Sequence, residues 1–80
     1  MYQRLDDNRR MTDVEAAVHY PDSYIIMRRD GMYSDMGTLL YVGDNMGELM
    51  SLVVEEGQPY CGIVEGLNYR RSLGGVVING

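Results

Sequence analysis

Apolar residues are concentrated in short runs that predict strands. The first two runs, at residues 24–29 and 38–42, are rich in β-branched and aromatic residues. The pair Asp30-Gly31 is a strong turn signal at the start of the segment between them. A third run, at residues 60–67, completes a pattern of β-hairpin, intervening segment and returning strand.

A short helix is predicted before the hairpin. Thr12 and Glu15 have the S/T-x-x-E spacing of a capping box, in which each side chain satisfies a backbone N–H of the other residue. The helix is expected over residues 13–19. It should end before Pro21, because the residue that precedes a proline is displaced from the helical region.

A second helix is predicted between the second and third strands. Asn45 and Glu48 again have the capping spacing, while Gly57 and Pro59 are typical of a helix end. Apolar residues recur with the i, i+3, i+4, i+7 spacing of one helical face. These residues are Met46, Leu49, Met50 and Val53. We therefore expect this face to pack on the sheet.

The first two strands are apolar at consecutive positions, so both faces of the sheet need cover. The second helix can cover one face. The first helix offers little apolar surface to the other, since its apolar residues are small: Val14, Ala16, Ala17 and Val18. This deficit predicts a homodimer through the face opposite the second helix. The alternative is that the N-terminal helix and the long loops complete the core within one chain.

The predicted fold class is α+β. We expect a three- to four-stranded, mainly antiparallel sheet with the main helix on one face and a short N-terminal helix. The fourth strand is a short closing strand at residues 76–78, after a loop at 68–75. Eighty residues fit a single domain, assigned to residues 12–80. Residues 1–11 are strongly polar and are expected to form a flexible N-terminal tail.

Net charge and cysteine content restrict the class of protein. The net charge of -5 argues against direct binding to nucleic acid, because such affinity depends on cations at the phosphates. No uncharged apolar run approaches the 18 residues of a membrane helix. The single cysteine cannot form an internal disulfide, and a cytoplasmic location without membrane association is expected.

Catalytic chemistry finds little support in the sequence. Cys61 and His19 are the only thiol and imidazole, but Cys61 is interpreted as a packing residue of the third strand. Two such residues 42 positions apart do not form a zinc cluster. The segment at residues 43–47 lacks the spacing of a phosphate-binding loop. No catalytic, cofactor-binding or metal-binding residues are therefore predicted.

The sequence indicates candidate partner-binding residues after the third strand. Tyr69, Arg70 and Arg71 precede a glycine-containing segment, and tyrosine and arginine are favoured at protein interfaces. The alternative is an ordinary solvated loop whose glycines permit a turn. We treat these three residues as candidates for contact with a protein partner.

These observations favour a small non-catalytic module that binds a protein or oligomerises. One alternative is an acidic inhibitor, of the kind mobile elements encode, that blocks a nucleic-acid-binding enzyme. Another is a small enzyme whose site forms between subunits, with a candidate set of Arg70, Tyr69, Glu65 and Asp44.

Overall fold

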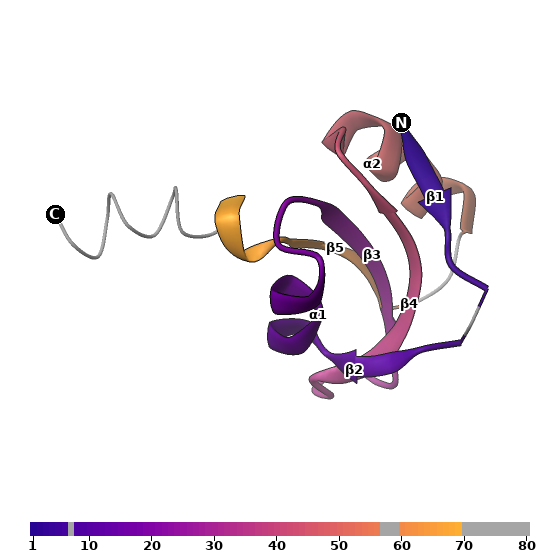
Figure 1. The fold of residues 1–80 in the computed structure, drawn as a ribbon. Coiled ribbons are helices and arrows are strands. Elements are labelled where there is room, and N and C mark those ends of the chain that lie inside the picture. Colours follow the sequence, from indigo (N-terminus) through magenta and orange to yellow (C-terminus); the bar gives the residue numbers. More distant parts are fainter. Residues whose placement is uncertain (7, 57–59, 70–80) are drawn as a thin grey trace, which may run out of the picture.

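The computed structural model describes residues 1–6, 8–56 and 60–69. Within these residues, five strands form one antiparallel sheet with two helices between them (Figure 1). The strands are β1 (Tyr2–Arg4), β2 (Arg10–Thr12), β3 (Tyr24–Arg29), β4 (Met36–Gly43) and β5 (Cys61–Glu65). The helices are α1 (Asp13–His19) and α2 (Met46–Glu56), and a helical turn at 67–69 follows β5. The predicted α+β class is confirmed.

The stretch expected to be a tail, residues 1–11, supplies most of one edge of the sheet. β1 pairs with the second half of β4 and β2 with its first half, so that Tyr2 lies opposite Gly43 and Met11 opposite Gly37. Between the two strands the chain turns through Asn8, whose φ is 54°. Backbone pairing to β4 replaces the expected tail. The polar composition gave no sign of it because edge strands tolerate charged side chains.

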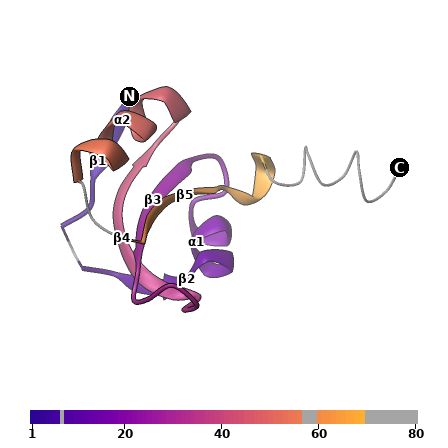
Figure 2. The same cartoon turned by 180° about the vertical axis from the view of Figure 1, so that it is seen from behind.

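The chain crosses over the sheet twice. β2 runs parallel to β3, and β4 runs parallel to β5, with one antiparallel strand between the members of each pair. Both crossovers move across the sheet in the same direction, but they start from β2 and β4, which run antiparallel to each other. Right-handed crossovers therefore place α1 and α2 on opposite faces of the sheet. Figure 2 shows the two helices at separate places around the sheet, and the core clusters confirm the arrangement.

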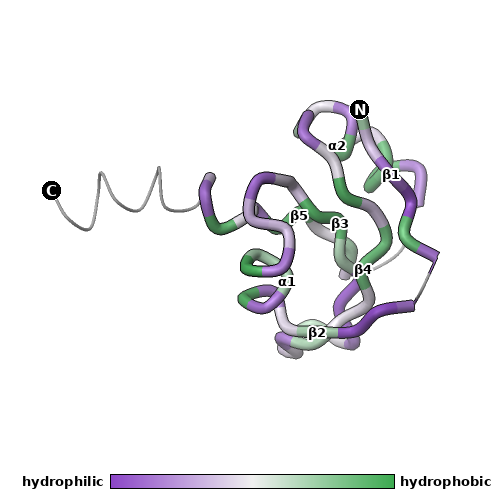
Figure 3. Tube along the Cα trace, viewed as in Figure 1, coloured by the Kyte–Doolittle hydropathy of each residue, from purple (hydrophilic) through white to green (hydrophobic). Residues whose placement is uncertain are grey.

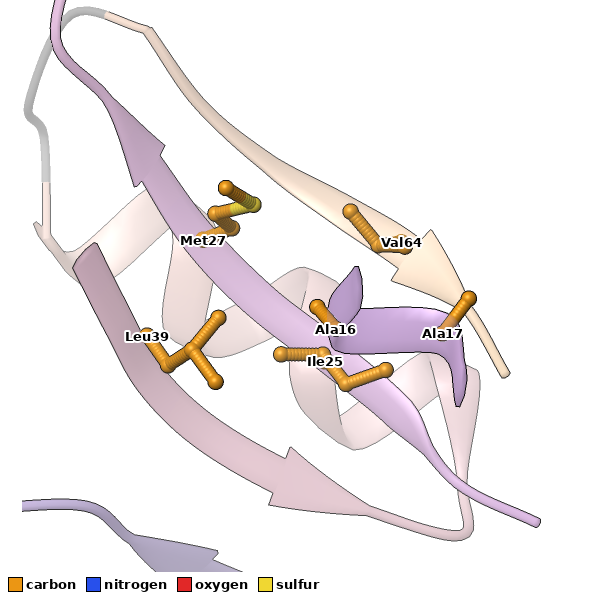
Figure 4. Close-up of a cluster of buried hydrophobic side chains, with 6 residues drawn as sticks. All are labelled: Ala16, Ala17, Ile25, Met27, Leu39 and Val64. Carbon is orange, nitrogen blue, oxygen red and sulfur yellow. The ribbon is translucent and has the colours of Figure 1, made fainter. Parts of the chain in front are cut away.

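One face of the sheet is covered by α1. Ala16 and Ala17 pack there among fully or almost fully buried side chains (Figure 4): Ile25, Met27, Leu39 and Val64. Alanines let the helix backbone approach the sheet closely, so a short helix suffices. The uncovered face on which the expected homodimer depended is therefore closed by α1 within one chain. Self-association itself remains a prediction.

The other face is covered by α2, which is rotated from the expected orientation. Leu49 and Leu52 are 0% and 9% exposed and pack on Ile26. Met46 and Met50, which were expected on the buried face, are 36% and 57% exposed. The apolar arc of this helix runs from Leu52 on one side past Met50 to Val54 on the other, and the sheet covers only the part that contains Leu49 and Leu52.

A register shift in the central strand pair explains the continuous apolar run of β4. The pairing slips between Ile26 and Met27, where β4 contains one extra residue. Consequently Leu40 and Tyr41 both contact the α2 cluster, whereas Leu39 belongs to the α1 cluster. Figure 3 shows hydrophobic positions along β3 and β4. The expected helix end at residues 57–59 and the closing strand at 76–78 lie outside the described residues.

Candidate functional site

The predicted partner-binding residues are only partly within the described chain. Tyr69 stacks on Tyr24, with ring centroids 4.7 Å apart and planes 15° from parallel. Tyr24 in turn packs against the α2 cluster. Arg70 and Arg71 follow Tyr69 and lie outside the described residues. The stacking fixes Tyr69 beside the α2 face of the sheet, and the binding role of the three residues stays a prediction.

Cys61 and His19 are on opposite sides of the molecule. Cys61 lies on β5 opposite Arg28, whereas His19 ends α1, on the other face. Burial raises the pKa of the Cys61 thiol, and the positive charge of Arg28 only partly opposes this effect. A raised pKa keeps the sulfur protonated and weakly nucleophilic. The structure therefore does not bring these two residues together as a nucleophile and base.

Acidic residues at the start of α2 have a structural partner. The amine of Met1 lies 2.8 Å from Asp44 Oδ1 and 2.7 Å from Glu48 Oε1. Hydrogen bonds with these carboxylates raise the pKa of the amine, and the amine lowers the pKa of Asp44. Asp44 and Glu48 thus form exposed ion pairs with the amine that precedes β1, at the α2 end of β4. Within the described residues, no three His, Cys, Asp or Glu side chains are grouped to hold a metal ion.

A surface that contains none of the predicted partner-binding residues lies between α2 and β5. It is a groove of about 340 Å³, here called the α2–β5 groove. Six described residues line it, and none of them is charged: Met46, Met50, Val53, Val54, Gly62 and Ile63. A second hollow beside α1, of about 330 Å³, differs in character because Glu15 and His19 contribute to its lining.

The exposed side of α2 is divided into an apolar flank and an acidic flank. At about 100° per residue, Met46, Met50 and Val54 lie along one side of the helix, toward β5. Val54 is 79% exposed. Glu48 and Glu55 lie on the opposite side, where Glu48 meets the Met1 amine. The apolar flank therefore lies over β5, and its side chains stay exposed to solvent.

β5 forms the edge of the sheet beside this flank. Hydrogen bonds from Arg29 N–H to Tyr60 O (3.1 Å) and from Gly66 N–H to Ser23 O (2.8 Å) fix the alternation of the β3–β5 ladder. In an antiparallel ladder, the backbone N–H and C=O groups of successive residues point in turn toward the paired strand and away from it. The backbone groups of three β5 residues therefore point away from β3. These residues are Cys61, Ile63 and Glu65. In the described part of the chain, β5 pairs with β3 alone.

The exposed apolar flank of α2, though not the groove itself, could have been anticipated from the width of the apolar arc on this helix. Leu52 and Val54 lie at opposite limits of this arc, and one sheet face cannot bury both limits of so wide an arc. The open edge of β5 could not have been anticipated, because it depends on strand order rather than on local sequence.

No protein-family model matches the chain, and no curated protein or solved structure is significantly similar to it. None of the helices in the described residues has the length and apolar character needed to span a membrane.

Proposed function

We propose that this protein is a small non-catalytic module that binds a protein or oligomerises, and that the α2–β5 groove is its binding surface. The observation that supports the proposal most strongly is the position of an uncharged groove beside a strand edge that pairs with no other strand of the described residues. Such an edge offers backbone hydrogen bonds to an incoming strand, and the groove accepts the side chains that determine specificity.

The exposed apolar flank gives this surface its energetic value. Met50 and Val54 are 57% and 79% exposed, so a partner that covers them removes apolar surface from water. Complete burial of such a side chain stabilises a complex by about 1.5 to 3 kcal/mol before ordering costs. Exposed apolar residues that form one contiguous patch, rather than isolated positions, are typical of interaction sites.

The candidate residues Tyr69, Arg70 and Arg71 extend this proposal. Tyr69 is held beside the α2 cluster by Tyr24, at the end of the sheet where β5 finishes. We propose that the two arginines that follow it flank the same partner. The uncharged lining of the groove favours an apolar partner surface over the basic surface that an acidic inhibitor would block. A cytoplasmic location and the absence of nucleic-acid binding remain part of the proposal.

A photo-activated cross-linking residue placed at position 54 of the full chain tests this function in the source cells. We expect position 54 to yield one identified protein product, either this chain itself or one other protein. The matched control is position 18, a valine in the last turn of α1 that is 57% exposed on the other face. No product at position 54, or the same products at both positions, would rule out the proposed surface.

A further inference from the structure

We infer that the α2–β5 groove is occupied by a second copy of this chain, with two β5 strands paired antiparallel about a two-fold axis at Ile63. The inference rests on the proposed function and specifies its partner. It differs from the dimer expected from the sequence, which used the face that α1 covers.

The backbone of β5 is self-complementary in this register. The outward-facing residues Cys61, Ile63 and Glu65 are symmetric about Ile63, and a two-fold axis there sets Ile63 opposite its own counterpart. Cys61 then lies opposite the partner subunit's Glu65. Each such pair exchanges two N–H···O bonds, so about six backbone hydrogen bonds join the strands.

The side chains fit the same axis. Ile63 packs in the α2 cluster and its neighbour Val64 in the α1 cluster, so Cys61, Ile63 and Glu65 share the α2 face. The two Ile63 side chains meet at the axis. Above them the apolar flanks of the two α2 helices face each other, and each covers Met50 and Val54 of the other.

Charge also favours this face for a second copy. Each chain has a net charge of -5, so two copies repel each other over most of their surface. The groove has no charged lining, and Glu48 and Glu55 lie on the far flank of α2. Glu65, the only charged residue among the outward-facing residues of β5, lies opposite the partner subunit's Cys61 in the proposed register. Each Cys61 has both Arg28 and Glu56 of its own chain nearby, so a cation as well as a carboxylate is close to that position. A basic partner would find no carboxylate in the groove to bind.

Sedimentation of the full chain between 1 and about 100 μM tests the dimer. We expect the wild type to reach twice the 9.1 kDa mass of one chain, and Val54→Glu to raise the dissociation constant at least about tenfold. Val18→Glu makes the same change in the last turn of α1 and should leave the dissociation constant unchanged. Circular dichroism confirms that both variants are folded.

A disulfide tests the register. In the Cys61→Ser background, Ile63→Cys places two thiols on residues whose Cα atoms are about 5.5 Å apart across the axis, within the range for a disulfide. We expect rapid oxidation to a covalent dimer. The native Cys61 lies about 14 Å from its counterpart in this register, at 3.4 Å per residue, and should not form one.

Three results would overturn the inference: a monomeric wild type, dissociation by Val18→Glu equal to that by Val54→Glu, or a disulfide through native Cys61 with none in the Ile63→Cys variant. If the wild type is monomeric and the Val77→Asp variant is a dimer, the edge of β5 is covered by residues 76–78 of the same chain rather than by a second copy. If the chain is monomeric but position 54 cross-links to another protein, the second-copy inference fails and the proposed function stands. If position 54 also yields no product, both fail.

Discussion

At the scale of single residues, Gly66 shows how closely the end of β5 meets the turn before β3. A Cβ at this position would lie 2.5 Å from the carbonyl oxygens of Tyr20, Pro21 and Ser23. Its N–H donates to one of these oxygens, that of Ser23, at 2.8 Å. Only glycine permits the backbone to approach three carbonyls in this way.

Gly66→Ala is expected to lower the free energy of unfolding by about 2 to 3 kcal/mol, since the carbonyls belong to backbone and cannot yield as a flexible side chain would. Gly31→Ala is the control, because a Cβ at Gly31 has no atom within 4 Å. Urea unfolding measures both variants. Similar midpoints for the two would show that the turn can shift to make room.

At the scale of elements, the rotation of α2 makes a clear prediction about two adjacent residues. Leu49 is fully buried and Met50 is 57% exposed. Leu49→Ala should cost about 2 to 5 kcal/mol of unfolding free energy, because it leaves a cavity above Ile26. Met50→Ala should leave stability nearly unchanged while it weakens binding to a partner. A loss of stability from Met50→Ala as large as that from Leu49→Ala would mean that the helix has the orientation expected from the sequence.

The ion pair of the Met1 amine with Asp44 predicts a pH range for the order of β1. The pKa of the amine is raised, so its contribution is present at low pH and is lost as the pH rises above that pKa. The pKa of Asp44 is lowered, so its contribution is lost as the pH falls below that value. β1 should be most ordered between the two limits, near neutral pH.

Asp44→Asn should increase hydrogen exchange at the backbone amides of β1 relative to their intrinsic rates, without a change in the β3–β5 ladder. Asp35→Asn removes the same charge from the exposed β3–β4 connection and is the control. Unchanged protection of β1 in Asp44→Asn would show that pairing with β4 alone holds this strand.

Local elements were predictable because local residues determine them. The Thr12–Glu15 capping box forms as expected, with Glu15 N–H donating to Thr12 Oγ1 at 3.1 Å, and α1 has the expected bounds. Asn45 likewise accepts from the N–H of Glu48 at 3.1 Å. β1 and β2 were missed because their pairing with β4 is made by backbone, which no hydrophobic pattern records.

At the scale of the whole molecule, the two edges of the sheet differ. Salt bridges from Arg4 to Asp6 and from Arg10 to Asp30 lie along the edge formed by β1 and β2, which also bends at Asn8. Charges and bends of this kind discourage pairing with another chain. The middle of β5 has neither charged side chains nor a bend, and the strand lies beside the exposed apolar flank of α2. Association is therefore expected at the β5 edge.

The candidate site could not be predicted from the sequence for a related reason. Met46, Met50 and Val54 are on one helix, but Gly62 and Ile63 join them only because β5 takes the outer position beside β3. Strand order depends on contacts between distant segments. Association with a protein is therefore a prediction from the sequence, and the location proposed for it depends on the fold.

Methyl NMR of the full chain with labelled methionines tests the central claim, occupancy of the α2–β5 groove, within one sample. Spectra are compared between dilute buffer and a concentrated extract of the source cells that includes the unlabelled chain. We predict that the Met46 and Met50 signals shift or broaden, whereas the signal of Met32, which is 68% exposed in the β3–β4 connection, stays unchanged. Unchanged Met46 and Met50 signals, or an equal change at Met32, would contradict the account.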